Sequence, residues 1–157
     1  ARPGRERYRR HIKTLLHVGG PLAGKAATTD TAVHAQRTGQ RLEIVPLSAP
    51  QLLKAPTGFE VLFANAPLPG ALVKAWHRSA HGGALRGTPS DIHPLTVLRT
   101  RSDATGRVTL RLPWCGVWML SVVHMVPAGD QPDIDWDSHW GNLTFERPCQ
   151  RTLRRGG

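Results

Sequence analysis

The chain of 157 residues lacks the sequence motifs that mark the common catalytic sites. It has no Gly-x-Ser-x-Gly elbow of a serine hydrolase and no His-Glu-x-x-His motif of a zinc protease. The segment from Gly19 to Lys25 is rich in glycine, but it contains Pro21 and lacks the P-loop spacing that cradles a phosphate. We therefore expect a binding or accessory protein and not an enzyme.

The chain also has little cysteine and no long hydrophobic run. Its two cysteines, Cys115 and Cys149, form no Cys-x-x-Cys pair and lack the Cys/His spacing of a zinc site. They permit one disulfide, which would tie the C-terminal tail to the sheet in an oxidising compartment, but we expect two reduced thiols. No apolar run approaches the roughly 18 residues that span a bilayer, so we expect no membrane span.

Acidic residues are scarce, because 11 Asp and Glu stand against 21 Lys and Arg, for a net charge of +10. A chain this basic attracts polyanions such as nucleic acid. The basic residues crowd the two ends of the chain, however, and arginine outnumbers lysine, as in proteins from GC-rich genomes. We interpret the ends as solvated termini and expect no nucleic-acid partner. Polyanion binding by these arginine-rich termini is kept as an alternative hypothesis.

What the chain does have is turns. It contains 16 Gly and 13 Pro with 39% hydrophobic residues, which is typical of short strands and unlike a helix bundle. The clearest turn runs from Asp103 to Gly106, where Asp can cap the backbone and Gly can adopt a left-handed conformation. After it, Val108, Leu110 and Leu112 alternate with polar residues, which predicts a strand with one buried face.

Seven strands are expected, at residues 41–47, 59–63, 71–76, 95–100, 107–112, 117–125 and 142–146. They predict an all-β fold, an antiparallel β-sandwich of immunoglobulin-like or prealbumin-like type. We expect residues 1–40 to form a basic N-terminal segment and flexible linker, residues 41–147 the β-sandwich domain, and residues 148–157 a basic tail. Within the first segment, residues 5–18 fit an amphipathic helix and a strand equally well.

Histidine is frequent, with eight residues in the chain, and four of them lie near the ends of expected strands. These candidate metal ligands are His77, His81, His93 and His124. Neutral imidazole suits Ni, Co, Cu and Zn, so the four predict a site for a divalent transition metal. The alternative is that they are ordinary surface and loop histidines. His124 follows Trp118 and Val122 on one strand face, and is either a ligand or a core histidine bonded to a backbone carbonyl.

The segment from Asp130 to Asp137 carries four carboxylates in eight residues. Hard cations such as Ca²⁺ favour several oxygen ligands, but this segment lacks the glycine and the closing glutamate of an EF-hand. We interpret it as an acidic loop that balances a basic protein. Trp136 and Trp140 are expected to seal the bottom of the core.

Five segments together resemble a bacterial envelope family. They are RLEIVPL at 41–47, PLPGALV at 67–73, DATGRVTL at 103–110, GVWMLSVVHM at 116–125 and DWDSHWGNLTFE at 135–146. In this order they resemble the NikM-like proteins of the periplasm, which are related to nickel or cobalt uptake. Where that family commonly has an aromatic residue between the two tryptophans, this chain has His139.

The resemblance implies a secreted, periplasmic protein with further strands before Arg5. The chain begins with Ala and carries no signal peptide, so we expect a processed or excised piece. The favoured hypothesis is a non-catalytic accessory protein that captures a nickel- or cobalt-like ion and hands it over. The alternative is a structural module that docks on an envelope protein complex without metal, through a strand edge or its basic ends.

Overall fold

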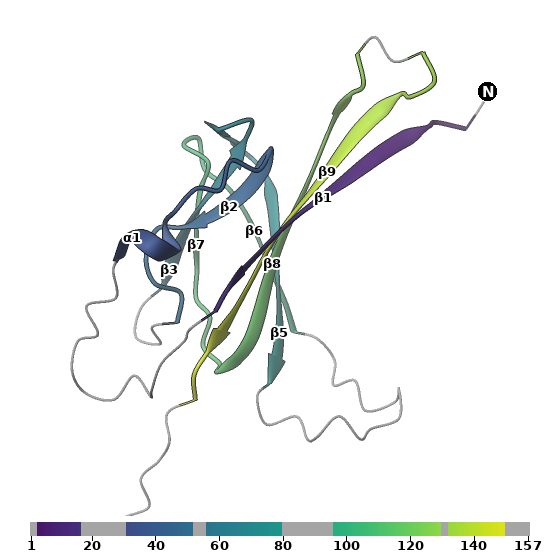
Figure 1. Ribbon diagram of the computed structural model, residues 1–157. Coiled ribbons are helices and arrows are strands. Elements are labelled where there is room, and N and C mark those ends of the chain that lie inside the picture. Colours follow the sequence, from purple (N-terminus) through teal and green to yellow (C-terminus); the bar gives the residue numbers. More distant parts are fainter. Residues whose placement is uncertain (1–2, 17–30, 52–55, 80–95, 130–131, 150–157) are drawn as a thin grey trace, which may run out of the picture.

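The computed structural model describes residues 3–16, 31–51, 56–79, 96–129 and 132–149, which form two β-sheets (Figure 1). Sheet A has the order β1 (Glu6–Leu15), β9 (Trp136–Arg147), β8 (Gly116–Pro127), β5 (Leu72–Ser79) and β6 (Thr96–Arg101). Sheet B contains β2 (Leu42–Pro46), β3 (Thr57–Phe63), β4 (Ala66–Pro67) and β7 (Arg107–Leu110). The helix α1 (Thr31–His34) is one turn long, and the described residues contain no helix with the length and apolarity to cross a membrane. The expected all-β sandwich is confirmed.

The core lies between the two sheets and is built from alternate residues of their strands. Trp118, Leu120 and Val122 of β8 point inward, as their spacing predicts, and each is at most 1% exposed. Phe59 of β3 and Phe145 of β9 stack across the gap with ring centroids 6.0 Å apart. Because burying each such side chain contributes about 1.5–3 kcal/mol, strand alternation is the main determinant of this fold.

The turn between β6 and β7 has the predicted chemistry. Asp103 Oδ1 accepts hydrogen bonds from the backbone N–H and hydroxyl of Thr105 and from the N–H of Arg107. Gly106 has φ = 75°, and a Cβ there would lie 2.9 Å from the backbone oxygen of Val61 and the backbone nitrogen of Leu68. Glycine is therefore needed both for the conformation and for the close approach of this turn to sheet B.

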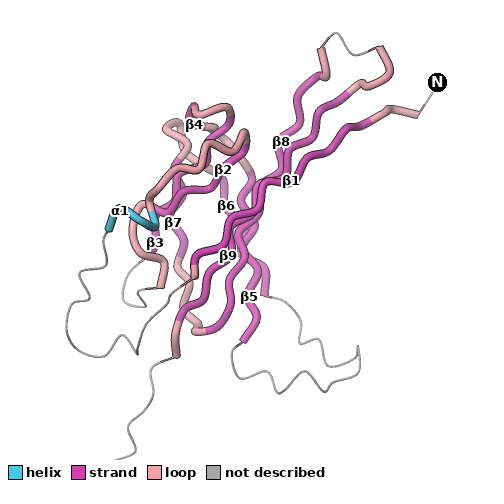
Figure 2. Tube along the Cα trace, in the orientation of Figure 1, coloured by secondary structure: helices cyan, strands magenta, loops and turns pink. Residues whose placement is uncertain are grey.

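β1 resolves the ambiguity of residues 5–18 in favour of a strand. It pairs with β9 in parallel, from Glu6 opposite Trp136 to Leu15 opposite Phe145. The other strand pairs of the described residues are antiparallel. Sheet A therefore takes an edge strand from the segment that we expected to precede the sandwich. Figure 2 shows β1, β9 and β8 running together beyond the strands of sheet B.

A buried ion pair ties β1 to sheet B. Lys13 Nζ lies 2.5 Å from Glu43 Oε1, and Glu43 is 1% exposed. The Glu43 carboxylate also accepts hydrogen bonds from the backbone and hydroxyl of Thr38 and from the N–H of Gly39. Burial acts to raise the pKa of Glu43, but Lys13 and the other donors outweigh it and hold the pKa below its usual value.

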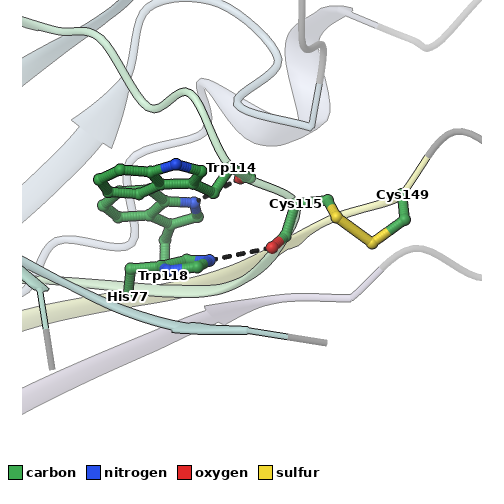
Figure 3. Close-up of a disulfide and its surroundings, with 5 residues drawn as sticks. All are labelled: His77, Trp114, Cys115, Trp118 and Cys149. Atoms are coloured by element: carbon green, nitrogen blue, oxygen red, sulfur yellow. Dashed lines mark hydrogen bonds between the residues drawn. A yellow bond between two sulfur atoms is a disulfide. The ribbon is translucent and has the colours of Figure 1, made fainter. Parts of the chain in front are cut away.

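The expectation of two reduced thiols is wrong, because Cys115 and Cys149 form a disulfide (Figure 3). Cys115 precedes β8 and Cys149 follows β9, and the register places Gly116 opposite Arg147. The antiparallel pairing of these two strands thus brings the cysteines together. The bond closes a loop that contains both strands, at a sequence separation of 34 residues.

Replacing Glu43 with Gln tests the buried ion pair through its pH dependence. Since the folded-state pKa is lowered, ionised Glu43 stabilises the fold above the usual value of 4.5, and this stability is lost as the pH falls through and below it. We expect the Tm of the wild type to fall more steeply than that of Glu43→Gln between about pH 6 and about pH 3 in thermal denaturation. Glu146→Gln removes an exposed carboxylate and should keep the wild-type slope. Equal slopes in all three proteins would contradict the interpretation.

Loss of the disulfide is expected to lower the free energy of unfolding by about 2–4 kcal/mol, because the unfolded chain is then no longer closed into a loop. Urea denaturation of the oxidised wild type and of the Cys115→Ala/Cys149→Ala variant measures the difference. Dithiothreitol should lower the stability of the wild type to that of the variant and leave the variant unchanged. A wild type that is insensitive to the reductant would argue against the bond.

Candidate functional site

His77 is held at the end of the sandwich next to the disulfide (Figure 3). Its Nε2 donates a hydrogen bond to the carbonyl oxygen of Cys115, with a separation of 2.9 Å. Its ring lies 4.7 Å from that of Trp118, which stacks on Trp114 at 5.9 Å. One ring nitrogen of His77 is thereby occupied by a backbone carbonyl.

His124 lies toward the other end of β8. The register places His77 opposite Trp118. Because Trp118 comes six residues before His124 on β8, His77 and His124 are about 20 Å apart along the strand direction. One metal ion cannot bind both His77 and His124. His81 and His93 lie outside the described residues, so a site that His77 shares with them stays a prediction.

Three histidines that are far apart in the sequence lie together on the inward face of sheet A. His124 of β8 is directly opposite His139 of β9, and His11 of β1 is opposite Gly141. His11 Nε2 and His139 Nδ1 are 3.2 Å apart, with the rings stacked at 5.5 Å. Phe63 of β3 lies edge-on to His124 and His139, with centroids 4.5 and 5.3 Å away. We call His11, His139 and His124 the inner histidine row.

Strand alternation and one glycine place this row against sheet B. His139 shares the inward face of β9 with Gly141 and Leu143, since alternate residues of a strand face the same side. A Cβ on Gly141 would lie 3.0 Å from Leu42 Cγ and 3.2 Å from the Leu42 carbonyl oxygen. The glycine therefore lets β2 approach β9 closely beside the histidines, which buries His139 to 1% exposure.

The three imidazoles share an environment that disfavours protonation. Burial, followed by the charges of Arg41 and His11, lowers the pKa of His139 below its usual 6.5. Burial lowers the pKa of His11 as well, with Arg9 and Arg41 adding to the effect, and burial lowers the pKa of His124. His139 Nε2 has no hydrogen-bond partner among the described residues, so a second proton there would bury a charged donor without an acceptor. These effects favour the neutral form of the rings, which is the form that binds metal ions.

Two arginines flank the row from different sheets. Arg9 of β1 is opposite His139 in the register, and Arg41, which precedes β2, lies over the Phe63 ring with Cζ 5.3 Å from its centroid. Within the described ranges, neither Arg9 nor Arg41 makes an ion pair. The row thus combines neutral imidazoles with two unpaired cationic side chains.

The acidic segment is engaged by the basic N-terminus. Asp133 pairs with Arg5, and both oxygens of Asp137 accept hydrogen bonds from Arg7, at 2.6 and 2.8 Å. The hydrogen bond from Arg7 is the main cause that lowers the pKa of Asp137. These contacts agree with an acidic loop that balances the basic chain. They also leave Arg5 and Arg7 less available to polyanions.

The row brings two ligands to one position, not three. In the part of the chain that the structure describes, no group of three or more His, Cys, Asp or Glu side chains is spaced to hold a metal ion. The pair of His11 and His139 is therefore the candidate site, and a bound ion would keep coordination positions for ligands that the protein does not supply.

The outward face of sheet A corrects the expectation that Trp136 and Trp140 seal the core. These side chains are 45% and 37% exposed, because they lie in opposite phase to the buried Leu143 and Phe145 along β9. Arg10 covers the Trp140 ring at 5.7 Å. We call the exposed set the outer apolar face: Tyr8, Ile12, Met119, Val123, Met125, Trp136 and Trp140.

The four candidates derived from the sequence omit His11 and His139. His11 becomes recognisable once residues 5–18 are taken as a strand, since Arg9, His11 and Lys13 then share one face. No local signal places His11 beside His139, because the two residues are 128 positions apart and meet only through the pairing of β1 with β9.

Comparison with known proteins shows the family but not its activity. A family model described as a domain of unknown function (DUF4198) matches residues 1–126. The match includes His11 and His124, whereas all of β9, with His139, lies beyond it. No curated protein and no solved structure matches the chain. The nickel or cobalt role stays a prediction, and the chain belongs to the DUF4198 family of uncharacterised domains.

Proposed function

We propose that this domain is a non-catalytic carrier that binds a divalent transition metal ion between His11 and His139. The observation that carries the proposal is the 3.2 Å separation of His11 Nε2 and His139 Nδ1. Two imidazole nitrogens about 2.05 Å from a shared ion lie about 2.9 Å apart at a right angle and about 3.3 Å apart at the tetrahedral angle. The separation falls within this range, so the two nitrogens already have the spacing that a shared ion requires, and the rings would turn to direct their lone pairs toward it.

The chemistry of the pair favours a borderline metal ion. Neutral imidazole suits Ni, Co, Cu and Zn and is a poor ligand for Ca or Mg. The resemblance to nickel- and cobalt-uptake proteins favours the first two ions. The disulfide between Cys115 and Cys149 supports an oxidising compartment such as the periplasm for this chemistry.

The small number of ligands suits capture and release. A structural zinc site usually closes about four protein ligands around its ion, whereas this pair supplies two. His139 is fixed in the core, and His11 is only half-buried on the edge strand, so the ion can be reached from solvent. We expect an exchangeable ion that a partner can remove.

Calorimetric titration with nickel, cobalt, copper and zinc tests the proposal. We expect the wild type to bind about one ion, and His11→Gln to lower the affinity about tenfold or more, equivalent to about 1.4 kcal/mol, because one of two protein ligands is lost. His139→Gln should lower the affinity by at least as much, since it also removes one of the two ligands, and circular dichroism checks that the variant remains folded. His34→Gln, which changes a histidine on α1, is the matched control. If a folded His11→Gln/His139→Gln variant gave the same heats of metal binding as the wild type, the proposed site would be rejected.

A second candidate function is docking on an acidic protein surface of an envelope complex, without metal. The outer apolar face favours it, because Trp, Tyr, Met and Arg are enriched where proteins meet. The register places cationic side chains on the same face, at Arg10, Lys74 and Arg99. Their charge complements a partner with carboxylates around an apolar centre.

Photo-crosslinking from position Val123 in cells, with the product identified by mass spectrometry, tests this candidate. We expect one acidic partner whose yield falls in Trp140→Ser, because the apolar centre of the face is lost. The yield should persist in His11→Gln, which leaves the outer face unchanged. Equal crosslinking of unrelated proteins, or none, would reject this function.

A further inference from the structure

We infer that the ion enters this site as a complex with a small polycarboxylate, whose free carboxylates pair with Arg9 and Arg41. The inference rests on the proposed function, since it concerns the remaining ligands of the ion held by His11 and His139. It names the form in which the cargo is recognised: a chelate and not a bare cation.

The coordination sphere is the first reason. Ions of this class bind about four to six ligands, and the described residues supply two imidazole nitrogens. The remaining positions are open to oxygen ligands from a molecule outside the chain. A chelating molecule fills several of them at once and loses less freedom on binding than separate ligands do.

Charge is the second reason. Imidazole ligands carry no negative charge that could offset a divalent ion, and the cationic Arg9 and Arg41 flank the pair. Both arginines are exposed, so water screens their repulsion of a cation in part, but the sign of the effect favours an anionic complex over a bare cation. A bare cation is therefore disfavoured here, whereas an anionic complex would be attracted by both arginines.

The protein carboxylates that lie in this region, Asp137 and Glu43, already accept hydrogen bonds from other groups. Both oxygens of Asp137 accept hydrogen bonds from Arg7. Both oxygens of Glu43 are used by Lys13, Thr38 and Gly39. Neither carboxylate can neutralise the ion without breaking these contacts, so the compensating anion must arrive with the metal.

The geometry of the arginines points to carboxylates. A guanidinium group presents paired N–H donors that match the two oxygens of a carboxylate. Arg9 belongs to sheet A and Arg41 to the start of β2, so they approach the histidines from two sides. A molecule with several carboxylates can chelate the ion with some of its oxygens and pair with both arginines through others.

Equilibrium dialysis of the full chain with nickel and radiolabelled citrate tests the inference. Citrate binds nickel in solution, so simple competition would remove the ion from a two-histidine site. We expect instead that nickel and citrate are retained together with the protein in equal amounts. Citrate without nickel should not be retained, since the ion is the link to the histidines.

Each arginine variant is expected to change the affinity for nickel citrate and the affinity for nickel alone in opposite directions. Arg41→Gln and Arg9→Gln should each lower the affinity for nickel citrate by about tenfold, because a charge-assisted hydrogen bond to carboxylate is lost. The same variants should raise the affinity for nickel in citrate-free buffer, because a repelling charge is removed. Arg10→Gln is the matched control, since Arg10 lies on the opposite face of the same strand.

The outcomes separate this inference from the proposed function. Nickel that binds alone and is stripped by citrate would overturn the chelate and leave the metal carrier standing. Absence of nickel binding under both conditions would overturn the carrier itself. Citrate retained without nickel, or nickel retained equally well with orthophosphate in place of citrate, would also overturn the assignment of a polycarboxylate complex.

Discussion

The parallel pairing of β1 with β9 is the constraint on which the candidate site depends. It joins the N-terminal strand to a strand more than 120 residues later, and its register sets His11 beside His139. The buried contact of Lys13 with Glu43 then ties the same strand to sheet B. A shift of the pairing by one residue would turn His11 outward and Ile12 inward, since neighbouring side chains of a strand face opposite sides.

Sheet A has two faces of different chemistry. Its inward face carries the core side chains along most of β8 and β9 and ends in the inner histidine row. Its outward face carries the exposed aromatic and methionine side chains with several cationic residues. The same strands thus carry the proposed metal site on one side and the proposed docking surface on the other, and each can be changed without replacing a residue of the other.

The charges around the inner histidine row decide which ligands it can bind. Burial and the neighbouring arginines lower the pKa of His11 and His139, which favours the neutral imidazole form that can bind metal ions. The nearby carboxylates are held by other partners, with Asp137 on Arg7 and Glu43 on Lys13. The cationic surroundings are unfavourable to a free cation, which is the physical basis of the proposal that the ion binds as a complex.

Much of the fold was accessible from local sequence, because the alternation of Val108 and Leu110, or of Trp118 and Leu120, reports which side of a strand is buried. The turn at Asp103 to Gly106 follows from local backbone chemistry in the same way. The strand at residues 6–15, the disulfide and the meeting of His11 with His139 were decided only by the tertiary structure. Residue patterns report burial and turns within a few positions, whereas the choice of strand neighbours depends on packing energies summed over the whole chain.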